Sequence, residues 1–336
     1  MSDERTRALR MRSQRLDGRA SGVAELVRHV VGIQAQEPRA AALSIRARTE
    51  GVTNADVESA IAGERSIVRA WAMRGTIHLV ASEDAGWLHD LLAPLARPAE
   101  HRVLDGLGVP REARARAVGT ISRALADHGP MTRAELCAEL ERKGIDTSGR
   151  RAAHLPRLAA LDGHLCFGPR RGGKDTYVLI DDWLGERPRL EREEALAELA
   201  RRYAAAYWPA EEGDFRAWSG LPASDSRAGW QHVLAAPPPT PRVAPPRPPI
   251  VRLLPAFDTY LLGYRSRELA VPDAFLRAVW PGGGIVRPTV VANGRAVATW
   301  RVERVGERLD VAVEPFGREP DVSEEAADVV RFLAAR

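Results

Sequence analysis

The chain has 336 residues, a length typical of two or three compact units. Hydrophobic residues make up 45% and charged residues 28% of the sequence, which excludes wholesale disorder. No uncharged apolar run approaches the roughly 18 residues of a membrane helix, and Cys137 and Cys166 alone cannot form a disulfide framework or a four-ligand zinc site. Because the charged N-terminus also lacks an apolar signal segment, the sequence predicts a cytoplasmic protein.

The basic residues are almost all arginines. Only Lys143 and Lys174 are lysines among 49 basic residues, which face 45 acidic ones. Such a bias is typical of a GC-rich genome, and it also suits planar, bidentate phosphate binding. A small net charge supports nucleic-acid binding only where it is clustered. Residues 148–175 form such a cluster, with a formal charge of +4.

The first predicted block, residues 1–110, is expected to be a first winged-helix unit with the Gln-Ala-Gln motif, and it combines helices with extended segments. Residues 22–36 have a helical pattern with apolar residues on one face. A second helix is predicted after Thr53, whose pairing with Asp56 is an acid variant of the capping box. Residues 66–80 then favour extended backbone, interrupted by a glycine.

The second block, residues 111–184, has the winged-helix order of three helices followed by a hairpin. The second of these helices begins with a capping box formed by Thr132 and Glu135. The third, over 150–163, contains Pro156, which either kinks the helix or marks its first turn. Two short strands then enclose a glycine- and arginine-rich loop. The third helix and this wing are the parts that usually contact DNA.

The third block, residues 185–236, repeats the three helices without a wing. Because the pattern recurs after about 80 residues, it predicts a tandem array of such units. Ser224 is the expected N-cap of the last helix. Residues 237–249, with eight prolines, are expected to form a polyproline-like linker.

The last block, residues 250–336, is rich in strand signals. Alternating apolar residues flank Asn293-Gly294, which is a strong hairpin signal. A terminal helix is expected after Ser323, with two glutamates in its first turn. Together the blocks predict a mainly α protein with small β-hairpins (α+β), in which tandem winged-helix units precede a small β-rich C-terminal subdomain.

Five segments, taken together, resemble the winged-helix DNA glycosylases of the AlkZ-like and YcaQ-like type. They are VVGIQAQEPRAA, RAWAMRGTIHLV, LCFGPRRGGKDTYVL, DFRAWSGL and LLPAFDTYLLGYRSR. They follow the family's order along nearly the whole chain, and the Gln-Ala-Gln element and the LLPAFDTYLLGYR stretch are the most distinctive. The resemblance implies a C-shaped protein that holds duplex DNA in its concave channel and excises alkylated bases without a metal or another cofactor.

Carried over by motif, Gln34 and Gln36 match the family's catalytic pair. Some members carry Asp at the second position, and the Gln in this chain resembles the branch linked to resistance against DNA-alkylating natural products. One departure is the proline-rich run, which stands where the family often continues the third unit with a wing. DNA contacts from that wing are therefore an open question for this chain.

The residues alone also allow a purely structural role for Gln34 and Gln36, in which their amides bond carbonyl groups at a helix end. Chemistry favours a catalytic role, because an N7-alkylated guanine already carries positive charge and leaves without protonation. The remaining tasks are to hold a water beneath C1′ and to stabilise an oxocarbenium-like sugar, which neutral amide oxygens can assist. The two side chains share one face only where the backbone is not helical.

Further candidates fall into two sets, and each residue could instead have a structural role in the core or on the surface. The lesion-pocket candidates are Trp71, Arg74, His78, Asp258 and Tyr260. Of these, His78 is expected to be a buried structural histidine, and Asp258 is the nearest candidate for a catalytic carboxylate if the glutamines are structural. The candidates for DNA binding are Arg150, Arg151, Arg170, Arg171, Lys174, Tyr264, Arg265, Arg267, Asn293 and Arg295.

Two of these candidates leave alternatives open. Lys174 is followed by Asp175 rather than Ser or Thr, so a wing along the DNA backbone fits this loop better than a nucleotide-binding loop does. Arg295, at the predicted hairpin tip, either enters a minor groove or belongs to an ordinary surface hairpin. No His or Cys lies near His78 at metal-ligand spacing, so no metal site is predicted.

These features predict a monomeric, monofunctional DNA glycosylase that hydrolyses the N-glycosidic bond of alkylated purines in duplex DNA. The expected substrates are N7-alkylguanine and, by resemblance, bulky natural-product adducts or interstrand crosslinks, in base excision repair or antibiotic self-resistance. The rival hypothesis is a non-enzymatic winged-helix transcriptional regulator. Such regulators usually bind as symmetric dimers, and the sequence has no leucine-heptad segment or obvious ligand domain.

Overall fold

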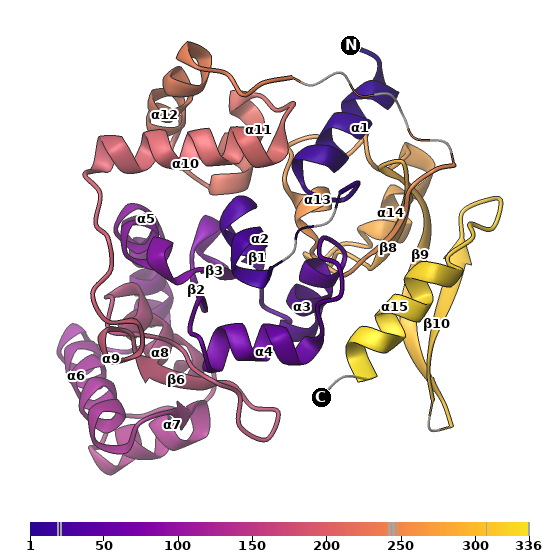
Figure 1. Cartoon of the computed structure of the whole chain (residues 1–336). Coiled ribbons are helices and arrows are strands. Elements are labelled where there is room, and N and C mark those ends of the chain that lie inside the picture. Colours follow the sequence, from indigo (N-terminus) through magenta and orange to yellow (C-terminus); the bar gives the residue numbers. More distant parts are fainter. Residues whose placement is uncertain are drawn as a thin grey trace. The chain divides into compact units, whose positions relative to one another are not determined.

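The computed structural model describes residues 1–18, 20, 22–240, 243, 246, 248–306 and 308–334. The chain forms two compact units. Unit 1 joins residues 1–57 to residues 196–336, and unit 2 comprises residues 58–195 (Figure 1). Helices dominate both units, and each contains a small antiparallel sheet, so the predicted mainly α class with small β-hairpins is confirmed.

Unit 2 contains the predicted order of three helices and a hairpin. Before it stand β2 (Ile67–Trp71), η1 (Met73–Gly75), β3 (Ile77–Ala81), η2 (Ser82–Asp84) and the long helix α5 (Ala85–Gly106). The winged-helix elements are α6 (Arg111–His128), β4 (Met131–Thr132), α7 (Arg133–Arg142), α8 (Arg151–Leu161), β5 (Leu165–Phe167) and β6 (Thr176–Leu179), followed by α9 (Ile180–Leu184). Within unit 2 the strands are ordered β3-β2-β5-β6-β4.

Local signals explain where these helices begin and end. The predicted capping box is present, because the Glu135 carboxylate accepts from Thr132 N at 2.7 Å while Thr132 Oγ1 accepts from Glu135 N at 3.4 Å. Gly129, at φ 72°, ends α6. Pro156 lies in the interior of α8, so its predicted alternative as a first-turn residue is wrong.

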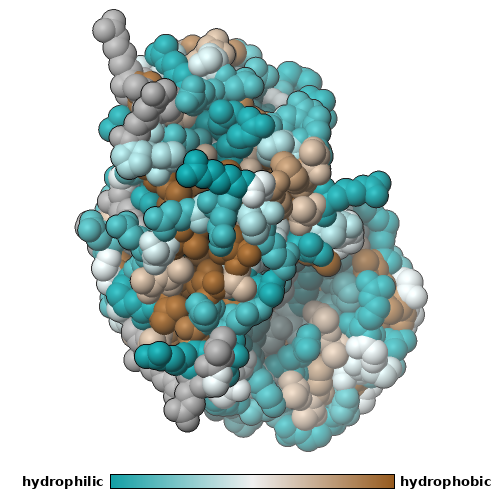
Figure 2. Space-filling model, turned by 90° about the vertical axis from the view of Figure 1, so that its right-hand side faces the viewer, coloured by the Kyte–Doolittle hydropathy of each residue, from teal (hydrophilic) through white to brown (hydrophobic). Residues whose placement is uncertain are grey.

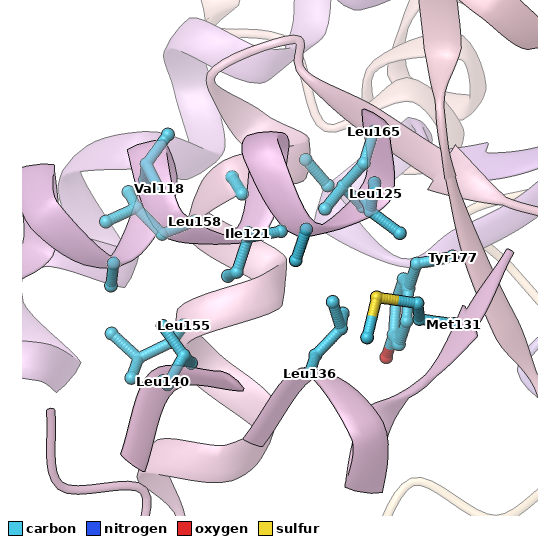
Figure 3. Packing of buried hydrophobic residues seen from close by; sticks show 14 of the residues in the cluster. Val118, Ile121, Leu125, Met131, Leu136, Leu140, Leu155, Leu158, Leu165 and Tyr177 are labelled. Carbon is cyan, nitrogen blue, oxygen red and sulfur yellow. The ribbon is translucent and has the colours of Figure 1, made fainter. Parts of the chain in front are cut away.

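The core of unit 2 lies where α6, α7 and α8 meet (Figure 3). Ile121, Leu136 and Leu155 come from these three helices and have no exposed surface. Burying one such side chain stabilises the fold by about 1.5–3 kcal/mol relative to its exposure. The hairpin joins this core through Leu165 and Tyr177, so the wing and the helices fold as one body.

Helix α5 packs along α8 and covers it. Glu100 of α5 is 1% exposed, and its carboxylate bonds His154 Nδ1 at 2.7 Å and Arg157 Nη1 at 2.6 Å. Arg97 of α5 donates to the Leu161 carbonyl at 2.6 Å. Every residue from Leu155 to Leu161 except Arg157 is buried. The helix that usually enters the DNA groove is therefore exposed mainly at its first turn.

Unit 1 contains a four-stranded antiparallel sheet with the order β10-β9-β8-β7. Its first part contains α1 (Asp3–Ser13), α2 (Val23–His29), β1 (Ile33–Gln34) and α3 (Pro38–Arg46). Helices α4 (Asn54–Ala62) and α10 (Arg192–Tyr207) cross the boundary between the units. The remainder is α11 (Glu212–Ser219), α12 (Ala223–Ala235), β7 (Val251–Leu254), α13 (Thr259–Leu262), η3 (Asp273–Phe275), α14 (Leu276–Val279), β8 (Thr289–Ala292), β9 (Arg295–Val305), β10 (Arg308–Pro315) and α15 (Ser323–Ala334).

Several boundaries in unit 1 test the predictions from sequence. The Thr53–Asp56 capping box is confirmed, with Asp56 Oδ2 accepting from Thr53 N at 2.7 Å. Ser224 is not an N-cap, because α12 already begins at Ala223 after Pro222. The proline fixes φ and lacks an N–H, so it suits the position before the first turn. The predicted linker falls partly outside the described residues, namely at Pro241, Arg242, Ala244, Pro245 and Arg247.

The Asn293-Gly294 hairpin is confirmed, with both residues at positive φ and Ala292 paired to Arg295. The turn of this hairpin packs against the rest of unit 1. Gly294 is buried, and the Tyr260 hydroxyl donates to its carbonyl at 2.9 Å. Asn293 also accepts from Ile250 N at 2.9 Å. The face of unit 1 that carries β9, β10 and α15 is mostly hydrophilic, with apolar side chains gathered near its centre (Figure 2).

Candidate active site around two glutamines

The two glutamines lie in a short extended segment between α2 and α3 (Figure 1). The helix predicted for residues 22–36 is too long, since α2 ends at His29 and Ile33–Gln34 form β1. Val31 adopts φ 64°, which a β-branched residue rarely does and which costs about 1–3 kcal/mol. The chain thus leaves the helix through a strained turn that redirects it before the first glutamine.

The side chains of Gln34 and Gln36 lie against each other. Gln34 ends β1 and Gln36 lies at the bend that follows, while Ala35 between them is fully buried. Gln34 Nε2 donates to Gln36 Oε1 at 2.6 Å. Gln34 is half-buried and Gln36 exposed, so the pair presents one anchored amide and one that reaches solvent.

A tyrosine from a distant helix holds the turn before this pair. The Tyr207 hydroxyl of α10 donates to the Val30 carbonyl at 3.1 Å. Tyr207 is fully buried and stacks on Tyr203, with ring centroids 4.6 Å apart. Trp218 packs against both tyrosine rings. The aromatic core of the third helical block therefore positions the backbone that leads to Gln34, a contact that sequence patterns did not indicate.

A buried ion pair fixes the end of α3. Arg48, just after α3, donates to Asp258 from Nη1 at 2.8 Å and from Nη2 at 2.7 Å, and neither side chain has exposed surface. Ser44 Oγ also donates to Asp258 at 2.7 Å, and Asp258 caps α13 by accepting from Tyr260 N. The Asp258 carboxylate is thus occupied by structural partners, so we leave it out of the candidate active site.

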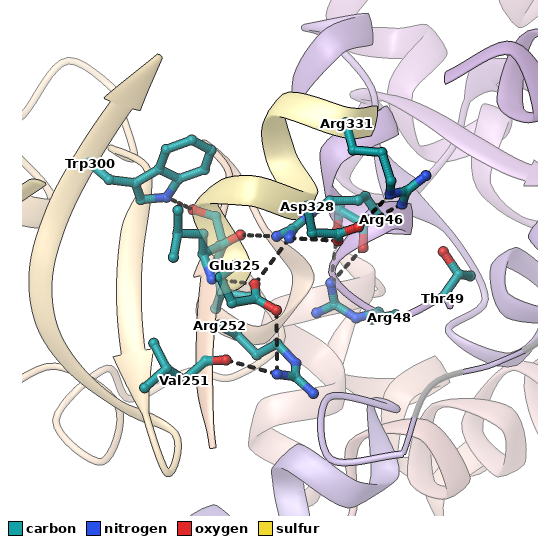
Figure 4. A network of polar contacts seen from close by, with 12 residues as sticks. Arg46, Arg48, Thr49, Val251, Arg252, Trp300, Glu325, Asp328 and Arg331 are labelled. Atoms are coloured by element: carbon teal, nitrogen blue, oxygen red, sulfur yellow. Dashed lines mark hydrogen bonds and ion pairs between the residues drawn. The ribbon is translucent and has the colours of Figure 1, made fainter. Parts of the chain in front are cut away.

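A second buried arginine ties α3 to the C-terminal helix and the sheet (Figure 4). Arg46 Nη1 contacts Glu325 at 3.0 Å and Asp328 at 3.1 Å, and its Nη2 donates to the Leu253 carbonyl at 2.9 Å. Glu325 also accepts from Leu253 N. The segment that carries the glutamines therefore continues into a helix whose far end is locked to β7 and α15.

Two tyrosines from the distinctive LLPAFDTYLLGYR stretch are structural. Tyr260 is 1% exposed, and its hydroxyl donates to Gly294 rather than facing solvent. Tyr264 is buried, with Arg10 3.5 Å above its ring and its hydroxyl bonded to the Tyr207 carbonyl. Burial raises the pKa of Tyr264 to about 12. These contacts leave neither ring available for a lesion or for DNA.

The remaining lesion-pocket candidates belong to unit 2. Trp71 is half-buried and stacks on Phe167, with ring centroids 4.7 Å apart. Arg74 is exposed at the turn between β2 and β3. His78 is 2% exposed, and burial, followed by the Arg74 charge, lowers its pKa from 6.5 to about 3. His78 is therefore a neutral, structural histidine, as the sequence indicated.

The wing of unit 2 is basic, but two of its cations are paired within the protein. Arg170 lies 3.4 Å from Asp175, and Arg171 contacts Glu135. Lys174 is exposed and forms no ion pair with any residue that the structure describes. The Arg171–Glu135 pair is exposed, and such pairs are worth only about 0–1 kcal/mol, whereas Asp175 is half-buried and also accepts from the buried Arg69. A phosphate group can therefore replace Glu135 as the partner of Arg171 at small cost.

Four further basic candidates for DNA contact are surface residues, two in each unit. In unit 2, Arg150 is exposed at the start of α8, and Arg151 is half-buried and bonds the Leu107 carbonyl. In unit 1, Arg265 and Arg267 are exposed, and Arg267 lies 4.5 Å from the Trp280 ring centroid.

Two findings concern the rest of the described chain. No described helix is long and apolar enough to span a bilayer. Among the residues with described positions, no group of three or more His, Cys, Asp or Glu side chains is arranged to hold a metal ion.

Comparisons with known proteins agree over nearly the whole chain. A family model for AlkZ-like DNA glycosylases matches residues 27–332. An interstrand DNA cross-link repair glycosylase from Streptomyces sahachiroi is 29% identical, and the match covers 96% of this chain and 94% of that protein. The solved structure of the Streptomyces sahachiroi DNA glycosylase AlkZ superposes with a TM-score of 0.77 at 27% identity, covering 99% of this chain and 96% of the other.

The fold and these matches define the class of protein, which is a DNA glycosylase, an enzyme that cleaves N-glycosyl bonds in DNA repair. The alternative of a transcriptional regulator is thereby set aside. The chain belongs to the AlkZ-like DNA glycosylase family, as the resemblance of its five segments indicated.

Proposed function

We propose that this glycosylase hydrolyses the N-glycosidic bond of N7-alkylated purines in duplex DNA, with Gln34 and Gln36 as its catalytic pair. The observation that carries the proposal is the 2.6 Å hydrogen bond from Gln34 Nε2 to Gln36 Oε1. This bond fixes the orientation of the exposed Gln36 amide. It also uses only one of the two lone pairs of Gln36 Oε1.

The chemistry follows from this arrangement. The second lone pair of Gln36 Oε1 accepts an O–H of the attacking water and turns the water oxygen toward C1′. As the cationic purine leaves, positive charge develops on the sugar, and the negative end of the amide dipole stabilises it. An amide is too weak a base to assist the loss of an ordinary, uncharged nucleobase. The site therefore selects for leaving groups that are already positively charged.

Within the catalytic pair, Gln34 also positions Gln36. Its own amide is half-buried and anchors Gln36, and the Tyr207–Val30 hydrogen bond anchors the turn before it. A preorganised amide does not need to reorient when the transition state forms, which is the main source of rate in such electrostatic catalysis.

DNA is bound in this proposal mainly through phosphates. In unit 2, α8 is covered by α5 and exposes chiefly its first turn, where Arg150 stands. The exposed Lys174 of the wing adds a second basic contact. Contacts to phosphate position a duplex without specifying its sequence, which suits an enzyme that must find a lesion anywhere. The monofunctional reaction and binding as a monomer are part of the same proposal.

The substrate range extends to bulky N7 adducts and interstrand crosslinks. The name of the Streptomyces sahachiroi relative, an interstrand DNA cross-link repair glycosylase, supports this extension. An open site supports it as well, because Gln36 is exposed. Protection of a producing cell against its own DNA-alkylating product is the corresponding biological role.

The test is single-turnover release of N7-methylguanine from duplex DNA by Gln36→Ala. We expect a rate loss on the order of 10²-fold, comparable to removal of one preorganised donor in other enzymes. Binding of lesion DNA should change little, because the interaction forms mainly in the transition state. Gln36→Asp should retain measurable activity, because its carboxylate can orient water and face the sugar cation.

Two controls make the test specific. Gln231→Ala removes an exposed glutamine from α12 and should leave the rate unchanged. The double variant Gln34→Ala/Gln36→Ala should lose less than the product of the single losses, because the residues act as a unit. Wild-type rates in Gln36→Ala, with an unchanged melting temperature, would refute the catalytic role of the pair.

A further inference from the structure

The turn that precedes the glutamine pair is held in a conformation that its sequence does not favour. Val31 adopts φ 64°, and its side chain is buried. The carbonyl of Val30 and the N–H of Val31 belong to one planar peptide unit, so any rotation of that unit changes φ of Val31. A group that holds the Val30 carbonyl therefore also holds Val31 in the left-handed region, which β-branched residues avoid.

The Tyr207 hydroxyl is such a group. It donates to the Val30 carbonyl at 3.1 Å, and neither residue has exposed surface. Val30 is the C-cap of α2, and carbonyls at the end of a helix lack an intrahelical donor. Tyr207 supplies the missing donor from the end of α10, a distant part of the sequence. One side-chain hydroxyl thus controls the peptide unit at which the chain turns toward the glutamines.

Packing fixes the position of the Tyr207 ring. Tyr203 stacks on the ring, with centroids 4.6 Å apart. Gly263 lies so close to Cδ1 and Cε1 of Tyr207 that a Cβ at this glycine would be 2.5 Å from both atoms. The Tyr264 hydroxyl donates to the Tyr207 carbonyl at 3.1 Å and so holds the backbone of the same residue. The hydroxyl is therefore preorganised to meet the Val30 carbonyl.

A second contact fixes the last residue of α2. His29 Nε2 donates to the Ser13 carbonyl at 2.6 Å, and Ser13 Oγ donates to the carbonyl of Trp208, which follows Tyr207, at 2.8 Å. These bonds join α1, α2 and the end of α10. Because the end of α2 is fixed, a rotation of the peptide unit that follows it would displace the segment that carries Gln34.

We propose that Tyr207 is a positioning residue for base excision, acting through its hydroxyl on the turn before the glutamine pair. This inference rests on the proposed catalytic role of Gln34 and Gln36. Without the hydroxyl, the peptide unit can rotate and bring Val31 to a negative φ, and the Gln36 amide is then no longer aimed at the reacting sugar. Helices α10–α12, which precede the proline-rich run, thus serve the reaction through their buried aromatic core.

The test begins with Tyr207→Phe in the full chain, which keeps the stacked ring and removes the hydroxyl. We expect single-turnover release of N7-methylguanine from duplex DNA to slow by about tenfold, because a misplacement of about 1 Å can cost about 10²-fold in rate. The dissociation constant for lesion DNA should change by less than about twofold, because the glutamine pair acts mainly in the transition state.

Tyr203→Phe is the matched control. The Tyr203 hydroxyl donates to the Gly263 carbonyl at 2.7 Å, and the side chain is as fully buried as that of Tyr207. The control removes the same atom from the same aromatic core and should lower the melting temperature by a similar amount. It should leave the excision rate unchanged, whereas a merely structural role of the Tyr207 hydroxyl would give equal rates in the two variants.

Two double variants test how the hydroxyl acts. In a Gln36→Ala background, Tyr207→Phe should cause no further loss of rate, because the amide that the hydroxyl positions is absent. In a Val31→Gly background, Tyr207→Phe should slow excision less than it does in the unmodified chain, because glycine adopts positive φ without strain.

Three results would overturn the proposal. One is equal excision rates in Tyr207→Phe and Tyr203→Phe. The second is a loss that appears entirely as weaker binding of lesion DNA. The third is an undiminished effect of Tyr207→Phe in the Gln36→Ala background. Wild-type excision by Gln36→Ala would refute the proposed function of the pair as well, whereas a slow Gln36→Ala beside an unaffected Tyr207→Phe would refute this inference alone.

Discussion

Replacement of Asp258 by Asn tests whether this carboxylate is structural or catalytic. It has no exposed surface, and it accepts from Arg48 at 2.7 and 2.8 Å, from Ser44 at 2.7 Å and from Tyr260 N at 2.9 Å. An asparagine keeps the shape but removes the charge, so the Arg48 guanidinium stays buried without a counter-charge. Breaking a buried pair from one side costs about 3–5 kcal/mol. That is a large share of the roughly 5–15 kcal/mol of a typical unfolding free energy.

Urea denaturation followed by far-UV circular dichroism measures this cost. Asp17→Asn, which removes the charge from a surface pair with Arg12 at 3.8 Å, is the control and should change stability by less than about 0.5 kcal/mol. The double variant Arg48→Met/Asp258→Leu should lose less stability than the two single losses together. A cost below about 1 kcal/mol for Asp258→Asn would refute the structural reading. A folded Asp258→Asn enzyme with more than about a hundredfold slower excision would make Asp258 the catalytic carboxylate.

Three further outcomes are expected. Because burial lowers the pKa of His78 from 6.5 to about 3, the unfolded chain takes up the proton first as pH falls. The protein therefore keeps its full stability above pH 6.5 and loses stability as the pH falls from about 6.5 to 3. His78→Gln should make the melting temperature depend less on pH over that window. Gly294→Ala should destabilise by about 1–3 kcal/mol in thermal melts, because a Cβ would meet the Tyr260 hydroxyl at 2.3 Å; Gly306→Ala, also at positive φ but in open space, should cost less. DNA affinity should fall with salt at a log–log slope of about −5 if about six phosphates are neutralised, and a slope near zero or selection of one operator sequence would contradict this.

Features set by neighbouring residues could be predicted from the sequence. The Thr132–Glu135 capping box and the Asn293-Gly294 turn each depend on residues within four positions of one another, so their signal is complete in a short window. The charge pattern of the wing was equally visible. Its pairing was not, because Glu135 contacts Arg171 only after the hairpin folds back onto α7.

Features that depend on distant contacts could not be predicted. The helical pattern through residue 33 is real, yet α2 ends at His29 because the chain turns at Val31. The hydroxyl that bonds the Val30 carbonyl in this turn comes from Tyr207, 177 residues further along. Asp258 looked available as a carboxylate because its partner, Arg48, is 210 residues away. The family resemblance of local segments therefore identified the glutamine pair and Asp258 as catalytic candidates. It did not reveal the long-range contacts that show Asp258 to be bound by structural partners.

The first helix has a practical consequence for fragment design. Gln14, at the end of α1, is fully buried, bonding the Tyr264 hydroxyl through Nε2 and accepting from Arg48 and Thr259 through Oε1. Ser13 adds a bond to the Trp208 carbonyl. The family match begins only at residue 27. An expression fragment cut at that boundary would remove α1 and leave polar groups of three buried side chains without their partner, so the minimal stable enzyme is longer than the region that the family model matches.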